Sequence, residues 1–320
     1  MAESPPIEVR GLVKRYGEIT AVDDVDLTVN SGDVFGYLGP NGAGKTTSLR
    51  MMLGLIRPSA GSVRLFGRDP QISVTALDGV AGFVEAPSFY PYLSGLDNLK
   101  LCQALDGGDN GMATIDEVLE IVELRDRAKD KVKGYSHGMR QRLGIASALL
   151  RRPRLLLLDE PATGLDPAGM RDMRMLIRDL GERGITVLLS SHQMNEVEEL
   201  CNRVAIIRSG RVAYEGSLAE LRNRSGVSYR LRTTDDARAT DVCAAQPGIE
   251  VLATSDAALA FKAENEDAVA ALSIALAESG APVVELTPRQ ATLEDLFFQL
   301  TEGDQRPRAT HTKQLIEEPA

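Results

Sequence analysis

The sequence predicts an α/β protein with a mostly parallel sheet, followed by a second, smaller α/β domain. Three observations support this fold class. Up to Leu221, short apolar segments of strand length alternate with helical segments, as is typical of parallel strands covered on both faces. A glycine-rich loop, residues 39–44, joins one of these strands to a helix. After Leu221, a polar segment precedes a new series of strand and helix patterns.

Length, charge and cysteine content narrow the class of protein. The 320 residues are enough for two domains. The net charge of −10 argues against general nucleic-acid binding, which requires a basic surface. The three cysteines form no zinc-ligand pattern and predict free thiols in a reducing compartment. No secretory signal is visible, and no segment has the ~18 apolar residues of a membrane helix. We therefore expect this chain to reach a membrane only through a partner.

The first part of the chain predicts strands on both sides of the glycine-rich loop. Residues 7–29 alternate apolar and polar side chains with a period of two, which indicates half-buried strands. The apolar strand Val34–Leu38 leads into the loop, and a helix is expected over residues 45–55. Residues 57–70 predict further strands and turns, and residues 80–84 another strand.

The middle of the chain alternates helices with buried strands. Residues 95–150 look mostly helical, with a loop at residues 106–111 and a helix that Ser136 opens and that extends through Leu150. The elements predicted beyond them are a strand at 154–158, a helix at 168–182, a strand at 186–190, a helix at 195–201 and a hairpin at 204–214. Strands and helices in this order favour a parallel sheet.

The C-terminal third predicts a separate domain. Residues 222–226 are interpreted as a polar linker between a first domain, residues 1–222, and a second, residues 227–300. The elements expected in the second domain are strands at 228–232, 259–261 and 283–286 and helices at 266–279 and 293–300. The polar residues 301–320 predict a disordered tail.

The strongest chemical signal is the glycine-rich segment GPNGAGKT, residues 39–46, which fits the pattern GxxxxGK[ST] between a strand and a helix. Glycines allow backbone N–H groups to turn towards phosphate oxygens, and the helix N-terminus adds partial positive charge. Lys45 is expected to reach the β- and γ-phosphates of a nucleotide, and the Thr46 hydroxyl to bind Mg²⁺. The predicted nucleotide-binding residues here are Gly39, Pro40, Asn41, Gly42, Ala43, Gly44, Lys45, Thr46 and Thr47.

Two acidic residues follow the leucine-rich strand at 155–158. Asp159 and Glu160 are predicted to lie at the carboxyl edge of the sheet, beside the phosphate loop. Asp159 can hold Mg²⁺ and Glu160 can polarise the attacking water. Adjacent acids alone are usually a solvated pair, but the four preceding leucines favour a functional site.

Ser136 begins a helix, and on a purely structural interpretation it is an N-cap. Its place in Ser136-His137-Gly138-Met139-Arg140-Gln141, shortly before the acidic strand, makes the chain resemble the ABC ATPase family. The resemblance implies that Ser136 and Gly138 grasp the γ-phosphate of an ATP held by the other subunit of a dimer.

Further positions follow from this resemblance, which covers residues 7–222 with the motifs in family order. Tyr16 matches the aromatic residue that stacks on adenine, although packing is the more usual role of such a tyrosine. Asp166 matches a residue at the dimer interface. His192 matches a switch histidine that contacts the γ-phosphate and joins Lys45 and Glu160 in catalysis.

Two departures from the family pattern stand out. Glu85 occupies the position where the family usually has a glutamine that binds Mg²⁺; a carboxylate can also be a ligand, so Thr46, Glu85 and Asp159 form the expected metal set. This substitution resembles a subgroup that exports peptide antibiotics and lantibiotics or confers bacitracin resistance. His137 and Met139 replace smaller residues of the commonest signature.

The resemblance implies an ATP-hydrolysing, Mg²⁺-dependent subunit of an ABC transporter. A separate membrane-spanning permease, a second identical or related ATPase subunit and a position on the cytoplasmic face of the cell membrane are expected, and nucleic acid is not. Residues 85–105 are the expected permease-docking segment, unless they are ordinary core. Multidrug or antibiotic export is favoured, and import stays open. A soluble ABC ATPase acting on ribosomes usually has two cassettes, and one acting on DNA has a long coiled coil before the signature; this sequence has neither.

Overall fold

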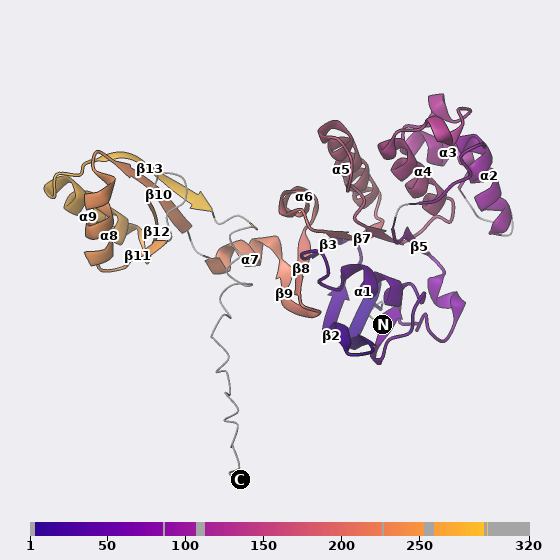
Figure 1. Cartoon of the computed structure of the whole chain (residues 1–320), viewed down its shortest axis with the longest axis horizontal. Helices are drawn as coiled ribbons and strands as arrows, with labels where there is room; N and C mark the ends of the chain where they lie inside the picture. The colour runs from indigo at the N-terminus through magenta and orange to yellow at the C-terminus, as the bar shows by residue number, and fades with distance from the viewer. Residues whose placement is uncertain are drawn as a thin grey trace, which may run out of the picture.

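A central sheet organises the N-terminal part of the chain in this computed structural model, which describes residues 4–85, 87–106, 113–225, 227–252, 259–290 and 293 (Figure 1). Its six strands lie in the order β5-β6-β7-β3-β8-β9, and only β9 runs antiparallel to its neighbour. The strands are β3 (Val34–Leu38), β5 (Val80–Phe83), β6 (Leu155–Asp159), β7 (Thr186–Ser191), β8 (Arg203–Arg208) and β9 (Arg211–Ser217). The mostly parallel sheet is confirmed.

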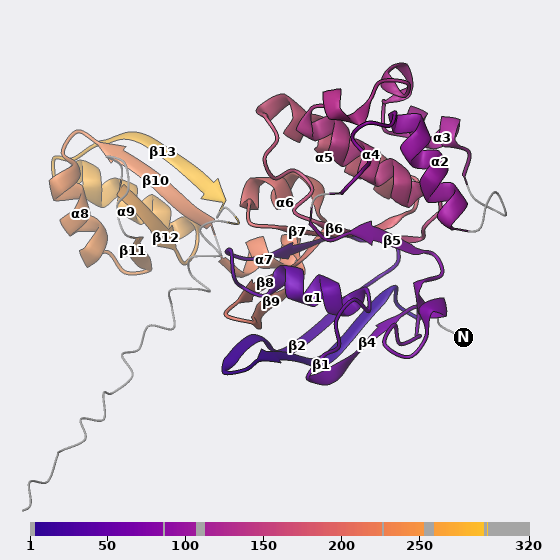
Figure 2. The ribbon, with the colours of Figure 1, turned by 45° about the vertical axis from the view of Figure 1, so that its right-hand side comes forward.

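One face of this sheet is covered by helix α1 and a small antiparallel sheet rather than by helices alone (Figure 2). The small sheet has the order β2-β1-β4, and the elements are β1 (Ile7–Tyr16), β2 (Ile19–Val29), β4 (Ala60–Leu65) and α1 (Lys45–Met52). Helix α1 is shorter than predicted because Gly54 adopts a φ of +71°, and a Cβ there would lie 2.8 Å from the carbonyl oxygen of Pro70. The predicted continuation to residue 55 was therefore wrong.

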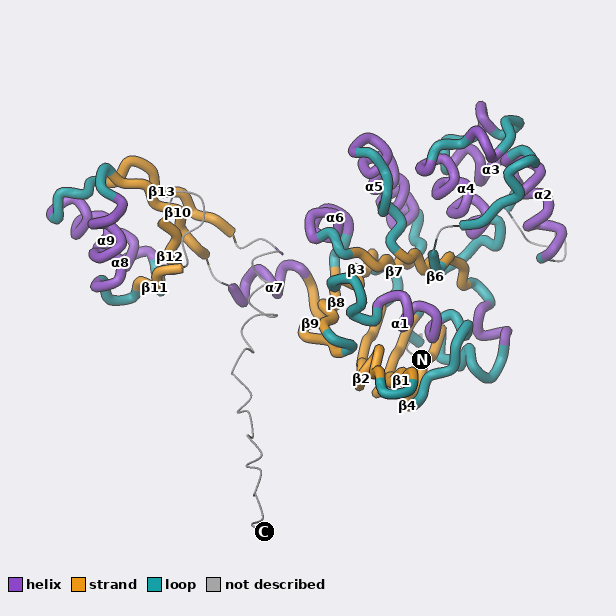
Figure 3. The backbone as a smooth tube through the Cα atoms, in the orientation of Figure 1, coloured by secondary structure: helices purple, strands orange, loops and turns teal. Residues whose placement is uncertain are grey.

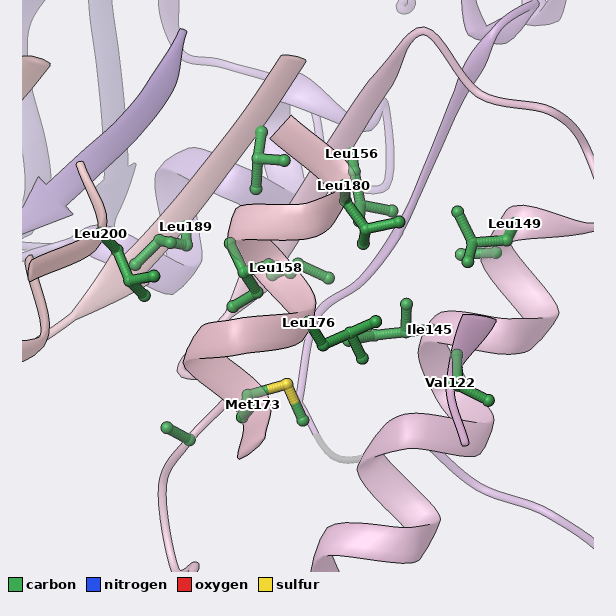
Figure 4. Packing of buried hydrophobic residues seen from close by; sticks show 14 of the residues in the cluster. Val122, Ile145, Leu149, Leu156, Leu158, Met173, Leu176, Leu180, Leu189 and Leu200 are labelled. Carbon is green, nitrogen blue, oxygen red and sulfur yellow. The ribbon is translucent and has the colours of Figure 1, made fainter. Parts of the chain in front are cut away.

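The other face of the sheet is covered by five helices of the described part of the chain. These are α2 (Gly95–Leu105), α3 (Ile115–Ile121), α4 (His137–Leu149), α5 (Pro167–Glu182) and α6 (Met194–Leu200). Short 3₁₀ helices lie at Arg125–Arg127 and Val132–Gly134, and a third, Val74–Leu77, packs on the α1 side through Leu77. Leu156 and Leu158 of β6 pack on this side with Met173 and Leu176 of α5 (Figure 4). Leu155 and Leu157 face the α1 side, so the leucine run reflects a strand buried on both faces.

A second unit follows α7 (Leu218–Ser225). Where the sequence predicts a polar linker from Arg222, the chain is helical as far as Ser225. Ser217 and Glu220 exchange side-chain-to-backbone hydrogen bonds of 3.0 Å each at its start. This reciprocal pair is a capping box that stabilises a helix N-terminus.

The second unit has the order βαββαβ with a four-stranded antiparallel sheet, β11-β12-β10-β13 (Figure 3). Its elements are β10 (Val227–Thr233), α8 (Asp236–Ala245), β11 (Ile249–Leu252), β12 (Leu259–Ala263), α9 (Glu266–Glu278) and β13 (Val283–Gln290). The sequence analysis missed α8 and β11. Helix α8 buries only Ala239 and Cys243, which leaves little helical periodicity to detect.

Leu293 returns from the second unit to the first. Its side chain is buried in the core cluster of α5 and α6, and its backbone N–H donates a 2.8 Å hydrogen bond to Glu198 Oε1. The rest of the predicted helix at 293–300, the tail at 301–320 and most of the loop at 106–111 lie outside the described residues. Among the helices that are described, none has the length and apolar character needed to cross a bilayer.

Candidate nucleotide-binding site

The glycine-rich loop joins β3 to α1, as the sequence predicts, and its shape requires glycine. Gly44 has a φ of +105°, and a Cβ there would lie 2.4 Å from the carbonyl oxygen of Ala21. Only a residue without a side chain fits this close approach to β2. The loop therefore presents its backbone at the N-terminus of α1, where partial positive charge favours anions.

A pocket of about 390 Å³ lies over this loop. Loop residues, Glu160 and His192 line it together, although they are far apart in the sequence; the lining residues are Ala21, Asn41, Gly42, Gly44, Lys45, Thr46, Thr47, Glu160, Thr163 and His192. The carboxyl ends of parallel strands meet at this edge, which is where open α/β sheets bind ligands. Gly39, Pro40 and Ala43 belong to the loop without lining the pocket.

Lys45 is buried at the centre of the loop, with 5% of its side chain exposed. Its Nζ donates hydrogen bonds to the carbonyl oxygens of Gly39, at 2.7 Å, and Pro40, at 3.2 Å. It also forms a 3.2 Å ion pair with Glu160 Oε1. These acceptors hold the Lys45 ammonium at the wall of the pocket, where it can bind a negatively charged ligand.

Asp159 is a buried carboxylate at the end of β6. The Thr46 hydroxyl donates to its Oδ2 at 2.9 Å, and the Ser190 hydroxyl donates to its Oδ1 at 2.5 Å. Thr46 and Asp159 therefore bring together a hydroxyl and a carboxylate oxygen of the kind that Mg²⁺ prefers, with room in the pocket for phosphate oxygens to complete the set.

Glu160 has the left-handed backbone conformation, with a φ of 49°. Its carboxylate is surrounded by donors: His192 Nδ1 lies 2.6 Å from Oε2, and the Thr163 hydroxyl donates to the same oxygen at 2.9 Å. Lys45 contacts the other oxygen. Strain of this kind concentrates at functional sites, and the turn aims the carboxylate into the pocket instead of along the strand.

The turn that carries His192 is tied to α6. The Ser191 hydroxyl donates to Glu196 Oε2 at 2.6 Å and accepts a 2.9 Å hydrogen bond from the Gln193 N–H. Burial raises the pKa of Glu196, and the negative charge of Glu160 raises it further. Within the described part of the chain, Glu196 Oε1 is buried and has no hydrogen-bond partner.

Ser136 and Gly138 lie at the N-terminus of α4, outside the pocket. The Ser136 side chain is the N-cap and accepts a 3.2 Å hydrogen bond from the Met139 N–H. Asp166 caps α5 in the same way, accepting from Gly169 N–H at 2.9 Å. All three predicted interface residues, Ser136, Gly138 and Asp166, therefore sit at helix starts, and none of them lines the Lys45 pocket of the same chain.

Two other predicted residues also lie apart from the pocket. Tyr16, at the end of β1, is half exposed, and the Lys14 ammonium lies 5.0 Å from its ring centre. Glu85, with a φ of 73°, forms an ion pair with Arg50 and leaves two thirds of its side chain exposed. Their roles in adenine and metal binding stay predictions.

Sequence reasoning missed Thr163 and Ser190. Ser190 pairs in register with Asp159 across parallel strands β6 and β7, so its position at the end of a predicted strand was a usable signal. Thr163 follows Glu160 by three residues, and its N–H donates to the Glu160 carbonyl oxygen at 3.1 Å. No sequence pattern indicated that turn.

Comparisons with known proteins agree with this geometry. Residues 22–163 match the family model described as "ABC transporter". The chain is 38% identical to the bacitracin transport ATP-binding protein BcrA of Bacillus licheniformis over 93% of this chain and 97% of that protein. It is 35% identical to the daunorubicin/doxorubicin resistance ATP-binding protein DrrA of Streptomyces peucetius over 95% and 94%.

A solved structure extends the comparison to three dimensions. The ATP-binding cassette MJ0796, determined as a dimer in a post-hydrolysis state with ADP and Pi, superposes with a TM-score of 0.59 at 26% identity. The match covers 66% of this chain and 98% of that one. The chain therefore belongs to the family of ABC transporter ATP-binding proteins, and it carries the ATPase fold of that family.

Proposed function

We propose that this protein is the ATP-hydrolysing subunit of an ABC exporter and that each active site combines two chains. One chain supplies the pocket around Lys45 and Glu160. The other supplies the N-terminus of α4, with Ser136 and Gly138. The observation that carries the proposal is the convergence of Lys45, His192 and Thr163 on the Glu160 carboxylate in a pocket above a phosphate loop.

Each residue of the pocket has its own role in the proposed hydrolysis of ATP. Lys45 neutralises phosphate charge, because its ammonium already faces the pocket from the loop. Glu160 accepts a hydrogen bond from the attacking water and orients it towards the γ-phosphate. His192 donates from its ring to Glu160 and stands where it can sense the γ-phosphate. Thr46 and Asp159 would hold Mg²⁺, which supplies charge neutralisation to the phosphate oxygens when bound.

The separation of Ser136 from the pocket supports a two-chain site. The helix start at α4 offers backbone N–H groups and partial positive charge to an anion, yet Ser136 does not line the pocket around Lys45 of the same chain. ATP bound between two chains would join both half-sites, and loss of the γ-phosphate contacts would let them separate. The dimeric state of the MJ0796 cassette is consistent with this arrangement.

A groove beside β5 is the proposed docking site for a membrane-spanning permease. It has a volume of about 410 Å³ and is lined by Phe83, Val84, Pro87 and Leu105, among others. Tyr90 and Tyr92 are exposed nearby in sequence, in the 85–105 segment. Exposed aromatic and apolar side chains around a groove favour protein contacts.

Export of an antibiotic or drug is the proposed transport reaction, at the cytoplasmic face of the cell membrane. The matches to a bacitracin transport protein and a daunorubicin/doxorubicin resistance protein extend over nearly the whole chain, including the second βαββαβ unit. The transported compound is specified by the permease and stays open.

The central experiment compares wild type with Glu160→Gln. Gln keeps the shape of the side chain but loses the charge, so hydrolysis should fall by about a hundredfold or more while ATP binding persists. Size-exclusion chromatography with ATP should then show a dimer of the variant. An active variant that stays monomeric would contradict the two-chain site. A multi-spanning membrane protein should co-purify from native membranes; recovery with ribosomes alone would leave the ATPase but overturn export.

A further inference from the structure

We propose that His137 is a positioning residue that links the N-terminus of α4 to the Glu160 carboxylate of the same chain through Thr163. His137 is the first residue of α4, directly after Ser136. Its Nε2 lies 3.2 Å from the carbonyl oxygen of Thr163. The inference rests on the proposed function, because it connects the half-site that meets one ATP to the half-site that hydrolyses another.

The tautomer of His137 follows from its partner. A carbonyl oxygen only accepts hydrogen bonds, so Nε2 must carry the proton and donate. The ring also lies against Gly164: a Cβ on Gly164 would be 3.5 Å from Nε2. The His137 side chain therefore holds the turn at residues 160–164 in place, through its hydrogen bond to Thr163 and its contact with Gly164.

Thr163 is the second link. Its carbonyl oxygen accepts from His137, while its hydroxyl donates to Glu160 Oε2 at 2.9 Å. Its N–H donates to the Glu160 carbonyl oxygen at 3.1 Å, which closes the turn. Any shift of the α4 N-terminus that moves the His137 ring therefore acts on a residue bonded twice to Glu160.

Glu160, the last residue in this series of contacts, is the proposed catalytic carboxylate. Glu160 Oε2 also accepts from His192 Nδ1, and Oε1 contacts Lys45. A small displacement of Thr163 changes the set of donors at Oε2 and so the direction of the carboxylate. Binding of a second chain's ATP at Ser136 would in this way prepare Glu160 for its own ATP. The two sites of a dimer would be coupled within each chain.

Two variants separate the hydrogen bond from the volume of the ring. His137→Leu fills similar space without a donor, and His137→Gln can still donate from its side-chain amide. One hydrogen bond between neutral groups corresponds to about a three- to tenfold change in rate. We expect the Leu variant to lose this factor in kcat, with a Hill coefficient for ATP closer to 1, and the Gln variant to recover most of it.

Wild type, His137→Leu and His137→Gln should bind a fluorescent ATP analogue with the same affinity as single chains, since the phosphate loop is unchanged in all three.

Thr163→Val removes the hydroxyl at nearly constant shape and should lower kcat as His137→Leu does. The double variant should be no worse than the poorer single variant, because both changes break one route. Thr163→Ser keeps a hydroxyl at this position, so it should recover most of the kcat that Thr163→Val loses.

A second readout does not depend on activity. The chain has three histidines, so ¹⁵N-histidine NMR can assign the ring of His137 by its loss in the Leu variant. The Nε2-protonated form with a slowly exchanging proton is expected. A rapidly exchanging ring, or the other tautomer, would overturn the inference, as would a Leu variant with wild-type kcat and cooperativity. An inactive wild-type chain that still shows the protected Nε2 proton would count against the proposed function and not against the contact.

Discussion

The pocket around Lys45 and the N-terminus of α4 are two parts of one proposed site, but they differ in how their polar groups are satisfied. In the pocket, Lys45, Asp159 and Glu160 are paired with one another and with neighbouring hydroxyls. At α4, the Ser136 hydroxyl is exposed and accepts a hydrogen bond from the Met139 N–H of its own helix. The pocket is organised before a ligand arrives, whereas the helix start keeps its binding capacity for another molecule.

This difference has a physical cause. The pocket lies where two strand ends, a loop and α1 meet, so its charges are partly buried and must be paired. The α4 N-terminus projects to the surface, where water satisfies its free N–H groups. Removing the cation of the pocket should therefore weaken ATP binding by the single chain, and changes at α4 should affect hydrolysis only when two chains meet.

Lys45→Ala is expected to give the largest effect. It removes the loop's cation and the ion pair at Glu160 Oε1. The affinity of the single chain for ATP should fall by about a hundredfold, the usual scale for losing one partner of a buried charge contact. A fluorescent ATP analogue measures this. Lys100→Ala, an exposed lysine on α2, is the control. Near-normal affinity of the Lys45 variant would refute the phosphate-loop role.

Ser136→Ala should separate the two regions. Its ATP affinity as a single chain should match wild type, while kcat should fall by about tenfold or more, because a hydrogen bond to a charged group is lost. Loss of the N-cap lowers stability by about 1 kcal/mol. Ser94→Ala is the control, since Ser94 caps α2 by the same contact, to the Asp97 N–H, and is not proposed to touch ATP. Equal losses of kcat in both variants would mean that Ser136 acts only as a cap.

Leu293→Ala probes the support behind the pocket. The side chain is buried against the cluster that includes α6, the helix after His192. We expect the free energy of unfolding to fall by about 2–4 kcal/mol, seen in urea titrations, with ATP affinity preserved at low temperature. Val284→Ala, at an exposed site in the second unit, is the control. A truncation after Leu221 should behave like Leu293→Ala; loss of ATP binding by a folded truncate would contradict the separation of the two domains.

Glu196→Gln is expected to give the smallest effect and to depend on pH. The pKa of Glu196 is raised in the folded state by burial, from an ordinary value of 4.5. The folded state then binds this proton more tightly than the unfolded state, so the stability it confers is present below pH 4.5 and is lost as the pH rises through the folded pKa. Relative to wild type, the variant should therefore gain stability as the pH rises from 4.5 into the neutral range.

Thermal unfolding across that range measures this difference. Glu266→Gln, at the exposed start of α9, is the control for the loss of a carboxylate that is not buried. A stability difference for Glu196→Gln that does not change with pH would show that the carboxyl group is solvated. In that case the polar groups beside the pocket would be solvated like those at the α4 N-terminus, and the proposed difference between the two regions would not hold.

Local sequence determined the phosphate loop, the buried strands and the starts of α4 and α5. These features depend on interactions within a few residues: glycines at fixed positions, a run of four leucines, and the caps Ser136 and Asp166. They can therefore be predicted from the local sequence. For the same reason Lys45, Asp159 and Glu160 could be selected before the fold was seen.

Tertiary structure alone decided which of these residues meet. In the folded chain, Glu160 lies between Lys45 and His192. Glu85 forms an ion pair with Arg50, and Ser136 lies outside the pocket. Tertiary structure also extended α7 into the expected linker and revealed the His137–Thr163 contact. Such outcomes depend on strand order and on the backbone turn at Glu160, which are set by packing across the sheet and not by neighbours in sequence.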